Sequence, residues 1–243
     1  MFHLVFLRAL VAKGEDKSLI ALKGGCNLRF YFGSVRYSED IDLDVVTIAK
    51  DTLRNKVDRL LKTPMVAAPL KTRGIEIIET SAPKQTETTQ RWKVGLRVSG
   101  SDVALRTKIE FSRRDAIEGT SFEAADREVL RPYGLTPVLA THYTTPMAIA
   151  QKIHALAGRT EPQARDVFDL NLLLARTDAA TVALDQKKKS LVPQAIEHAM
   201  SISFDEYVSK VVAFLDPLQA DVFGDRSAWD AMQEEVVARL EAL

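Results

Sequence analysis

Cysteine is almost absent from this sequence, which has only Cys26 in 243 residues. One cysteine cannot build an internal disulfide framework or a cysteine zinc site, and it suits a reducing cytosol. The sequence also lacks an excess of either charge, because Lys plus Arg and Asp plus Glu both number 33. The total charge therefore does not indicate a nucleic-acid partner, although a basic face can exist within a neutral total.

Long apolar runs are also missing. The segment 1–7 is apolar, but Arg8 follows it, well short of the roughly twenty apolar residues that a membrane span needs. It also lacks the basic leader of a signal peptide. We interpret this segment as a core helix and expect a soluble, cytoplasmic protein without a membrane partner.

The hydrophobic content of 46% is enough to bury a core, and the first part of the chain mixes strand and helix patterns. A helix is expected over 50–61. The strands expected by period-2 alternation and apolar content are 41–45, 74–79, 92–98 and 104–111, with a polar connection at 80–90.

The second part of the chain has helical patterns only. Thr145 and Pro146 predict a helix start, Pro162 precedes another helix, and Ser203 with Glu206 has the spacing of a capping box. An amphipathic helix is expected from Ser227. We therefore predict an α+β domain over 1–139 and a helical domain over 140–243. The basic run 187–189 is expected to be a solvated loop and is a secondary candidate for phosphate binding.

The most distinctive feature is an acidic strand in which Asp40, Asp42 and Asp44 alternate with apolar residues. Side chains two residues apart share a strand face and lie roughly 6–7 Å apart. Asp40 and Asp42 are therefore close enough to hold one or two magnesium ions, which prefer hard oxygen ligands. The alternative is an exposed edge strand whose acidic face is only solvated.

Two further segments favour the metal interpretation. Gly24 and Gly25 lie upstream of the strand, and paired glycines allow a backbone to approach a phosphate closely. Lys108 and Glu110 are expected on one face of a neighbouring strand, where Glu110 could complete the carboxylate set and Lys108 could meet a phosphate. The alternative for this second pair is a surface ion pair.

A third candidate is a pair of helices. Lys152 and Arg159 are expected on one helix face, and Asp166 and Asp169 share a face of the following helix. A helical hairpin would bring these charges together, either as part of a site or as a buried network that pins the helices. His154 is expected to serve packing or the surface, since no second histidine lies at metal spacing.

Together these segments resemble a known family. The runs 23–29, 31–33 and 36–43 are similar to the first motif of the AbiEii/AbiGii toxin nucleotidyltransferases, and 108–111 is similar to their second. Lys152, Arg159 and the run 165–170 resemble their later motifs. The resemblance implies a polymerase-β-like mixed sheet followed by a C-terminal helical domain that closes over the nucleotide.

The resemblance also implies residue roles. Ser38 and Asp40 would form the Ser-x-Asp element, with Asp42 as the second strand carboxylate, Lys152 as the lysine at the triphosphate and Asp166 as an essential aspartate. Asp166 would orient Lys152 or help to activate the acceptor hydroxyl. The expected metal ligands are Asp40, Asp42 and Glu110, and the expected nucleotide-binding residues are Lys23, Gly24, Gly25, Arg29, Lys108 and Arg165. Cys26 and Asn27 stand where small or hydroxyl residues are expected.

The expected function is magnesium-dependent transfer of a nucleotide from a nucleoside triphosphate (NTP) to an acceptor, with manganese as an alternative metal. The resemblance points to the 3′ end of tRNA as the acceptor and to a cognate antitoxin as a partner. Two alternatives stay open: a kinase-like activity that phosphorylates or nucleotidylates protein hydroxyls, and a non-catalytic regulatory module. The preferred triphosphate and the oligomeric state are not predicted.

Overall fold

The computed structural model describes residues 1–12, 14, 16–176, 182 and 184–243, and it divides into two compact units. Unit 1 contains 1–31 and 38–143, and unit 2 contains 32–37 and 144–243. The predicted boundary at 139/140 falls inside a strand, Leu139–Tyr143, which belongs to the sheet of unit 1. The assignment of 32–37 to the second unit was not expected from the sequence.

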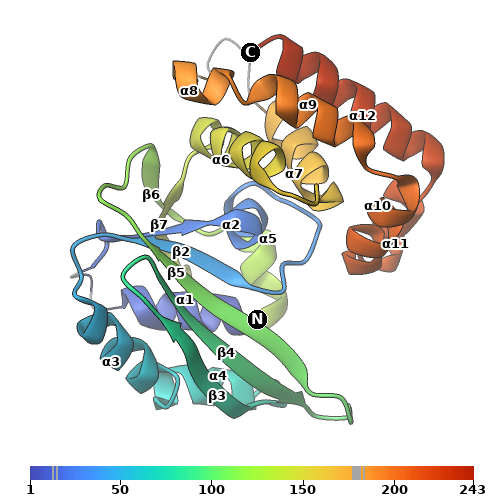
Figure 1. Cartoon of the computed structure of the whole chain (residues 1–243). Helices are drawn as coiled ribbons and strands as arrows, with labels where there is room; N and C mark the ends of the chain where they lie inside the picture. The colour runs from blue at the N-terminus through green and yellow to red at the C-terminus, as the bar shows by residue number, and fades with distance from the viewer. Residues whose placement is uncertain (13, 15, 177–181, 183) are drawn as a thin grey trace. The chain divides into compact units, whose positions relative to one another are not determined.

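Unit 1 is built on a seven-stranded sheet with the order β3-β4-β5-β2-β1-β7-β6 (Figure 1). The strands are β1 (Ile20–Lys23), β2 (Ile41–Val45), β3 (Ile75–Gln85), β4 (Thr89–Val98), β5 (Leu105–Arg113), β6 (Thr120–Ala124) and β7 (Leu139–Tyr143). β2 pairs parallel with β5 and antiparallel with β1, so the sheet is mixed, as predicted. The acidic strand is therefore interior to the sheet, and its interpretation as an edge strand is wrong.

The period-2 pattern assigns the two faces of this sheet. Ile41 and Leu43 on β2, like Trp92 on β4 and Phe111 on β5, enter the hydrophobic core. The helices of unit 1 are α1 (Phe2–Val11), α2 (Gly24–Tyr31), α3 (Lys50–Leu60), α4 (Pro64–Lys71) and α5 (Arg127–Leu130), followed by a 3-10 turn, η1 (Arg131–Tyr133). Core residues from α1, α3 and α4 pack with those of the sheet, and Trp92 Nε1 donates to Asp58 of α3 over 2.7 Å.

Three local predictions for unit 1 can be compared with the structure. The N-terminal helix and the helix at 50–61 are confirmed by α1 and α3. The polar connection predicted at 80–90 is wrong, because β3 continues to Gln85 and β4 begins at Thr89. The 80–85 part of β3 is mostly exposed, so its pairing with β4 needs no apolar residues and leaves no hydrophobic period in the sequence.

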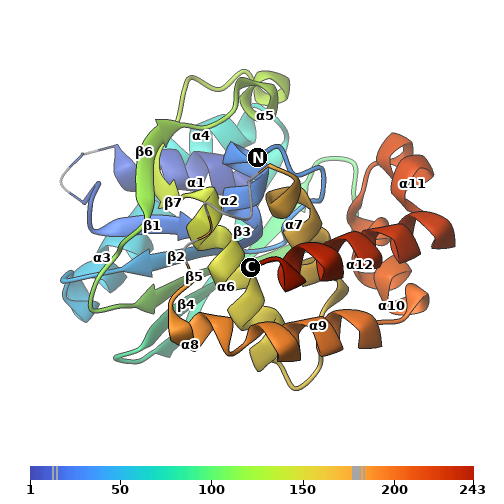
Figure 2. The same ribbon diagram turned by 90° about the horizontal axis from the view of Figure 1, so that it is seen from above.

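Unit 2 contains helices and short turns, as predicted. The elements are α6 (Thr145–Gly158), α7 (Ala164–Ala175), α8 (Gln186–Lys189), α9 (Val192–Ser201), α10 (Phe204–Lys210), η3 (Val212–Phe214), α11 (Pro217–Phe223) and α12 (Arg226–Glu241). α9 and α12 lie side by side in both views (Figures 1 and 2). The predicted capping box of Ser203 and Glu206 begins α10.

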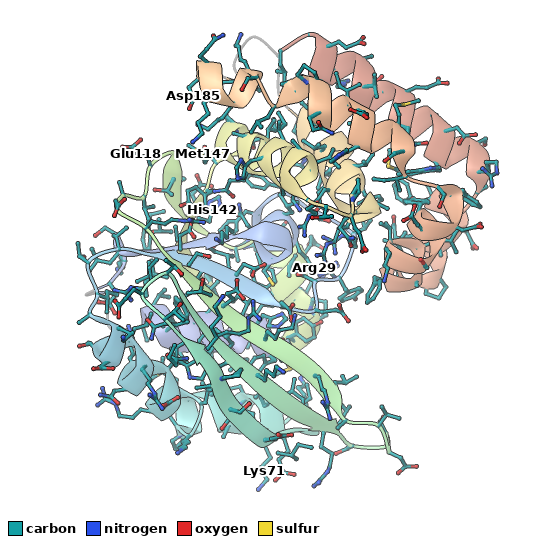
Figure 3. The ribbon with its side chains drawn as sticks, in the orientation of Figure 1. Arg29, Lys71, Glu118, His142, Met147 and Asp185 are labelled. Carbon is teal, nitrogen blue, oxygen red and sulfur yellow. The ribbon has the colours of Figure 1, made fainter. Side chains whose placement is uncertain are left out.

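The basic run at 187–189 is helical instead of the predicted loop. It forms α8 after Asp185, whose carboxylate accepts from the Lys188 amide and caps the helix (Figure 3). Among the residues that the structure describes, no helix combines the length and the apolar character that a membrane crossing requires.

Candidate active site

The first part of the site is the junction of β1 and α2. The predicted glycine turn is a direct passage from strand to helix, because α2 begins at Gly24. Gly24 has φ +65°, and a Cβ atom there would lie 2.7 Å from Oδ2 of Asp42. Glycine is therefore required both for the left-handed backbone and for the close approach of Asp42. Gly25 follows in the first turn, and Arg29 lies in the last turn of α2 (Figure 3).

The carboxylates of β2 and β5 are brought together by strand register. Asp42 is directly opposite Glu110 on β5 and opposite Lys23 on β1. Residues opposite one another on paired strands project to the same face, so Asp42 and Glu110 are side-chain neighbours. The sequence analysis placed Glu110 on a neighbouring strand, and the register of β2 with β5 now gives Asp42 as its direct neighbour.

Asp40 and Glu110 are each neutralised by a basic side chain. Lys108 binds Asp40 through its backbone amide, at 3.0 Å from Oδ1, and through Nζ, at 2.8 Å from Oδ2. Arg91 on β4 donates to Oε2 of Glu110 over 2.5 Å. Ion pairing, the alternative considered for Lys108 and Glu110, is present, but each residue pairs with a different partner.

A divalent metal is consistent with this donor set. Within the described ranges, no three or more His, Cys, Asp or Glu side chains lie close enough together to hold a metal ion in this structure. Asp42 and Glu110 are nevertheless register neighbours, and Asp40 is two residues before Asp42. All three offer hard oxygen donors, which suit magnesium or manganese. Magnesium at these residues stays a prediction.

Ser38 takes the role of a turn residue. Its Oγ donates to the carbonyl oxygen of Asp40 over 3.0 Å, which closes the turn before β2. The place of Ser38 in the Ser-x-Asp element of the active site stays a prediction.

Asp44 differs from the other two aspartates of the strand. It is 3% exposed, so the predicted open acidic face is wrong at this position. Its Oδ1 accepts from Lys23 Nζ at 2.6 Å and Arg114 Nε at 3.2 Å, and its Oδ2 accepts from Tyr143 Oη at 2.7 Å. Burial, followed by the hydrogen bond to Asp44, raises the pKa of Tyr143. Lys23, predicted to bind nucleotide, therefore neutralises a buried carboxylate, and its predicted role has no support in this geometry.

The charged residues of α6 and α7 form a cluster within unit 2. Lys152 Nζ lies 2.9 Å from Oδ1 of Asp166 and 2.6 Å from Oδ2 of Asp169, and Arg159 Nε lies 2.9 Å from Oδ2 of Asp166. This confirms the predicted meeting of the two polar faces. His154 is exposed, as expected. Arg165 lies in the first turn of α7 and contributes positive charge near Asp166.

Burial and charge pairing oppose one another in this cluster. Burial disfavours the charge of Lys152, but Asp166 and Asp169 outweigh it and raise the pKa of Lys152. Burial likewise disfavours the charge of Asp166, but Lys152 and Arg159 lower the pKa of Asp166. Lys152 and Asp166 are therefore both charged near neutral pH.

Arg36 was missed as a site residue by sequence reasoning. It is buried, and its Nη2 lies 3.0 Å from Oδ2 of Asp169. The two residues are 133 positions apart, so no periodicity connects them. Arg36 belongs to the segment 32–37, which follows α2 and is part of unit 2, and the chain returns to unit 1 at Ser38.

No curated protein matches the sequence. Two solved structures share the fold: JHP933 from Helicobacter pylori, with 19% identity and a TM-score of 0.53 over 97% of this chain and 90% of that one, and a proposed nucleotidyltransferase from H. pylori, with 19% identity and a TM-score of 0.55 over 97% and 93%.

The family comparison covers nearly the whole chain. Residues 5–242 match the model described as the nucleotidyl transferase AbiEii toxin of type IV toxin–antitoxin systems. That range includes the acidic strand, the β1–α2 junction and the α6–α7 charge cluster. The chain therefore belongs to the AbiEii family of nucleotidyltransferase toxins.

Proposed function

We propose that this nucleotidyltransferase transfers a nucleotide from an NTP to the 3′ end of tRNA, with magnesium bound by Asp40 and Asp42 and Glu110 as a third ligand. The observation that carries the proposal is the register of Asp42 with Glu110 on adjacent parallel strands, with Asp40 two residues away. Manganese, which accepts the same oxygen donors, is an alternative metal.

The surroundings of the carboxylates support a phosphate substrate. Lys108 and Arg91 balance Asp40 and Glu110 in this structure, and both side chains are partly exposed. α2 begins at Gly24, and the first backbone amides of a helix are good donors to phosphate. When bound, magnesium would neutralise triphosphate charge and help to align the reacting oxygens.

In unit 2, we assign Lys152 the role of neutralising the negative charge of the triphosphate. Asp166 is assigned the role of orienting Lys152. The raised pKa of Lys152, produced by its two carboxylate partners against the effect of burial, keeps it cationic. Both oxygens of Asp166 already accept from cations, and its side chain is fully buried. These contacts favour an orienting role over activation of the acceptor hydroxyl, because such a carboxylate is a weak base.

The acceptor and the partner are inferred from the family. Membership in a type IV toxin–antitoxin family implies a cognate antitoxin. The family resemblance supports tRNA as the acceptor, and the test below includes protein as the alternative acceptor.

The test uses NTPs labelled at the α-phosphate or at the γ-phosphate, with total tRNA or total protein as the acceptor. We expect α-label on tRNA with one of the four NTPs in the presence of magnesium. Asp40→Asn and Asp42→Asn should each reduce this labelling more than about a hundredfold, since loss of an outer partner of a metal ligand already costs about 10–100-fold. Asp102→Asn, at an exposed aspartate of the same unit, is the control and should label normally.

Each contrary result has a defined meaning. Label on protein alone would replace the tRNA acceptor, and transfer of γ-label alone would indicate a kinase-like reaction. Equal labelling by wild type, Asp40→Asn and Asp42→Asn would overturn the assignment of the carboxylates.

A further inference from the structure

A chain of hydrogen bonds lies beneath the Ser38–Asp40 turn, on the core side of β5. Nε2 of His3, on α1, is 2.7 Å from Oγ1 of Thr107, and this hydroxyl is 2.6 Å from the carbonyl oxygen of Glu39. Nδ1 of His3 is 3.5 Å from Sγ of Cys26, which is 3.3 Å from the carbonyl oxygen of Asp40. His3 thus connects the two side chains that reach the carbonyls of Glu39 and Asp40.

The protons of this chain can be assigned from the acceptors. A carbonyl oxygen only accepts, so the hydroxyl proton of Thr107 goes to Glu39. Thr107 must then accept from His3, which places the imidazole proton on Nε2. The single thiol proton of Cys26 is within reach of two acceptors, the carbonyl oxygen of Asp40 and Nδ1 of His3. Loss of hydration lowers the pKa of His3 to about 4, so the ring is neutral at physiological pH.

Consecutive residues of β5 hold Asp40 from opposite faces of the sheet. Thr107 is buried on the core side and binds the backbone at Glu39, whereas Lys108 binds the carboxylate of Asp40 from the open side. Alternation along a strand produces this arrangement. The peptide groups at Glu39 and Asp40 are therefore held from the core side, and their position sets where the Asp40 carboxylate lies.

We propose that His3 is a positioning residue for Asp40, acting through Thr107 on the turn that precedes β2. The inference rests on the proposed function only in treating Asp40 as a metal-binding carboxylate. His3 itself does not touch the reacting groups in this assignment. Its role is to keep Thr107 oriented as a donor to Glu39, much as outer partners orient metal ligands in other proteins.

The variants separate this role from general stability. Thr107→Val and His3→Leu remove the donor to Glu39 and the donor to Thr107, while Thr107→Ser and His3→Gln keep a donor at each position. Thr141→Val is the matched control. Thr141 is 8% exposed against 7% for Thr107, and it also donates from a strand to a backbone carbonyl, that of Lys17.

The first readout does not depend on activity. Nitrogen NMR of the wild-type imidazole should show protonated Nε2 and unprotonated Nδ1 at His3. The amide resonances of Asp40 and Lys108 should shift in Thr107→Val and His3→Leu and remain near wild type in Thr141→Val. Another tautomer, or unchanged resonances in both variants, would overturn the inference even if the protein is an active transferase.

The second readout is the binding of Mn²⁺ without nucleotide, together with the kinetics of tRNA labelling. Thr107→Val and His3→Leu should weaken Mn²⁺ binding and lower kcat about 10–100-fold with little change in KM for the NTP. Thr107→Ser and His3→Gln should recover most of both. If Thr141→Val lost as much Mn²⁺ binding and kcat as Thr107→Val, the effect would come from general destabilisation, and the inference would be contradicted. Failure of wild type to bind Mn²⁺ or to label tRNA counts against the proposed function, whereas the NMR result still decides the positioning role.

Discussion

Asp42 and Asp44 are two residues apart on one strand face, yet their side chains have different environments. Asp44 is buried and forms an ion pair with Lys23, whereas Asp42 is only partly buried. We predict that Asp44→Asn lowers the free energy of unfolding by about 3 kcal/mol, because removing one partner of a buried ion pair leaves the other uncompensated. Asp42→Asn should cost less than about 1 kcal/mol while abolishing transfer.

Urea unfolding of the two variants, beside the labelling assay, checks this contrast. Equal losses of stability would mean that Asp42 also has a structural role. A fully active Asp42→Asn protein would remove it from the proposed metal site.

The pH dependence of stability should report on Asp166. Its folded-state pKa lies below the ordinary value of 3.8, against the effect of burial, because Lys152 and Arg159 favour the carboxylate. A carboxyl with a depressed pKa contributes stability that is present above its unfolded pKa and is lost as the pH falls through the folded value. The stability advantage of wild type over Asp166→Asn should therefore be constant near neutral pH and shrink below pH 3.8.

Urea titrations of both proteins at a series of pH values measure this difference, since the carboxyls common to both cancel. An advantage that grew on acidification would contradict the assigned direction of the shift.

At the scale of elements, the β1–α2 junction requires glycine at position 24. Gly24 and Gly100 both have positive φ, but only at Gly24 would a Cβ meet another group, Oδ2 of Asp42 at 2.7 Å. Alanine at either position should cost about 1–2 kcal/mol of stability from the left-handed backbone. Only Gly24→Ala should also displace Asp42 and reduce transfer.

Thermal unfolding and tRNA labelling of Gly24→Ala and Gly100→Ala form the matched comparison. Normal labelling by Gly24→Ala would show that the close approach of Asp42 to the backbone is not needed for the reaction.

At the scale of the whole molecule, the chain passes from unit 1 to unit 2 at 32–37 and again after Tyr143. The pair of Arg36 and Asp169 holds the first of these segments within unit 2. We predict that Arg36→Met lowers the stability of unit 2 by about 3 kcal/mol, since both partners of the pair are buried.

Each unit contains one of the two tryptophans, Trp92 in unit 1 and Trp229 in unit 2, and both are buried. Fluorescence of Trp92→Phe and Trp229→Phe backgrounds can therefore follow the units separately. Arg36→Met should move the unfolding midpoint reported by Trp229 to lower urea. An unchanged Trp229 midpoint would show that the pair adds nothing to unit 2.

The sequence alone determined features that depend on neighbouring residues. The alternation around Asp42, the capping box of Ser203 and the stripe of α12 follow from local periodicity and local hydrogen bonding, and the structure confirms each. The motif spacing also identified the family, and the shared faces of Lys152 with Arg159 and of Asp166 with Asp169 suggested the hairpin of α6 and α7.

Only the tertiary structure decided how residues far apart in sequence are paired. Strand order separated Asp42, which faces Glu110, from Asp44, which is buried against Lys23 and Tyr143, although the local pattern treats both aspartates alike. The link between Arg36 and Asp169 and the support of Asp40 by Thr107 and His3 likewise depend on long-range contacts. The side-chain period of a strand predicts which face of the sheet a residue occupies. The strands and helices that pack beside that face determine whether the residue is buried and which side chains it contacts.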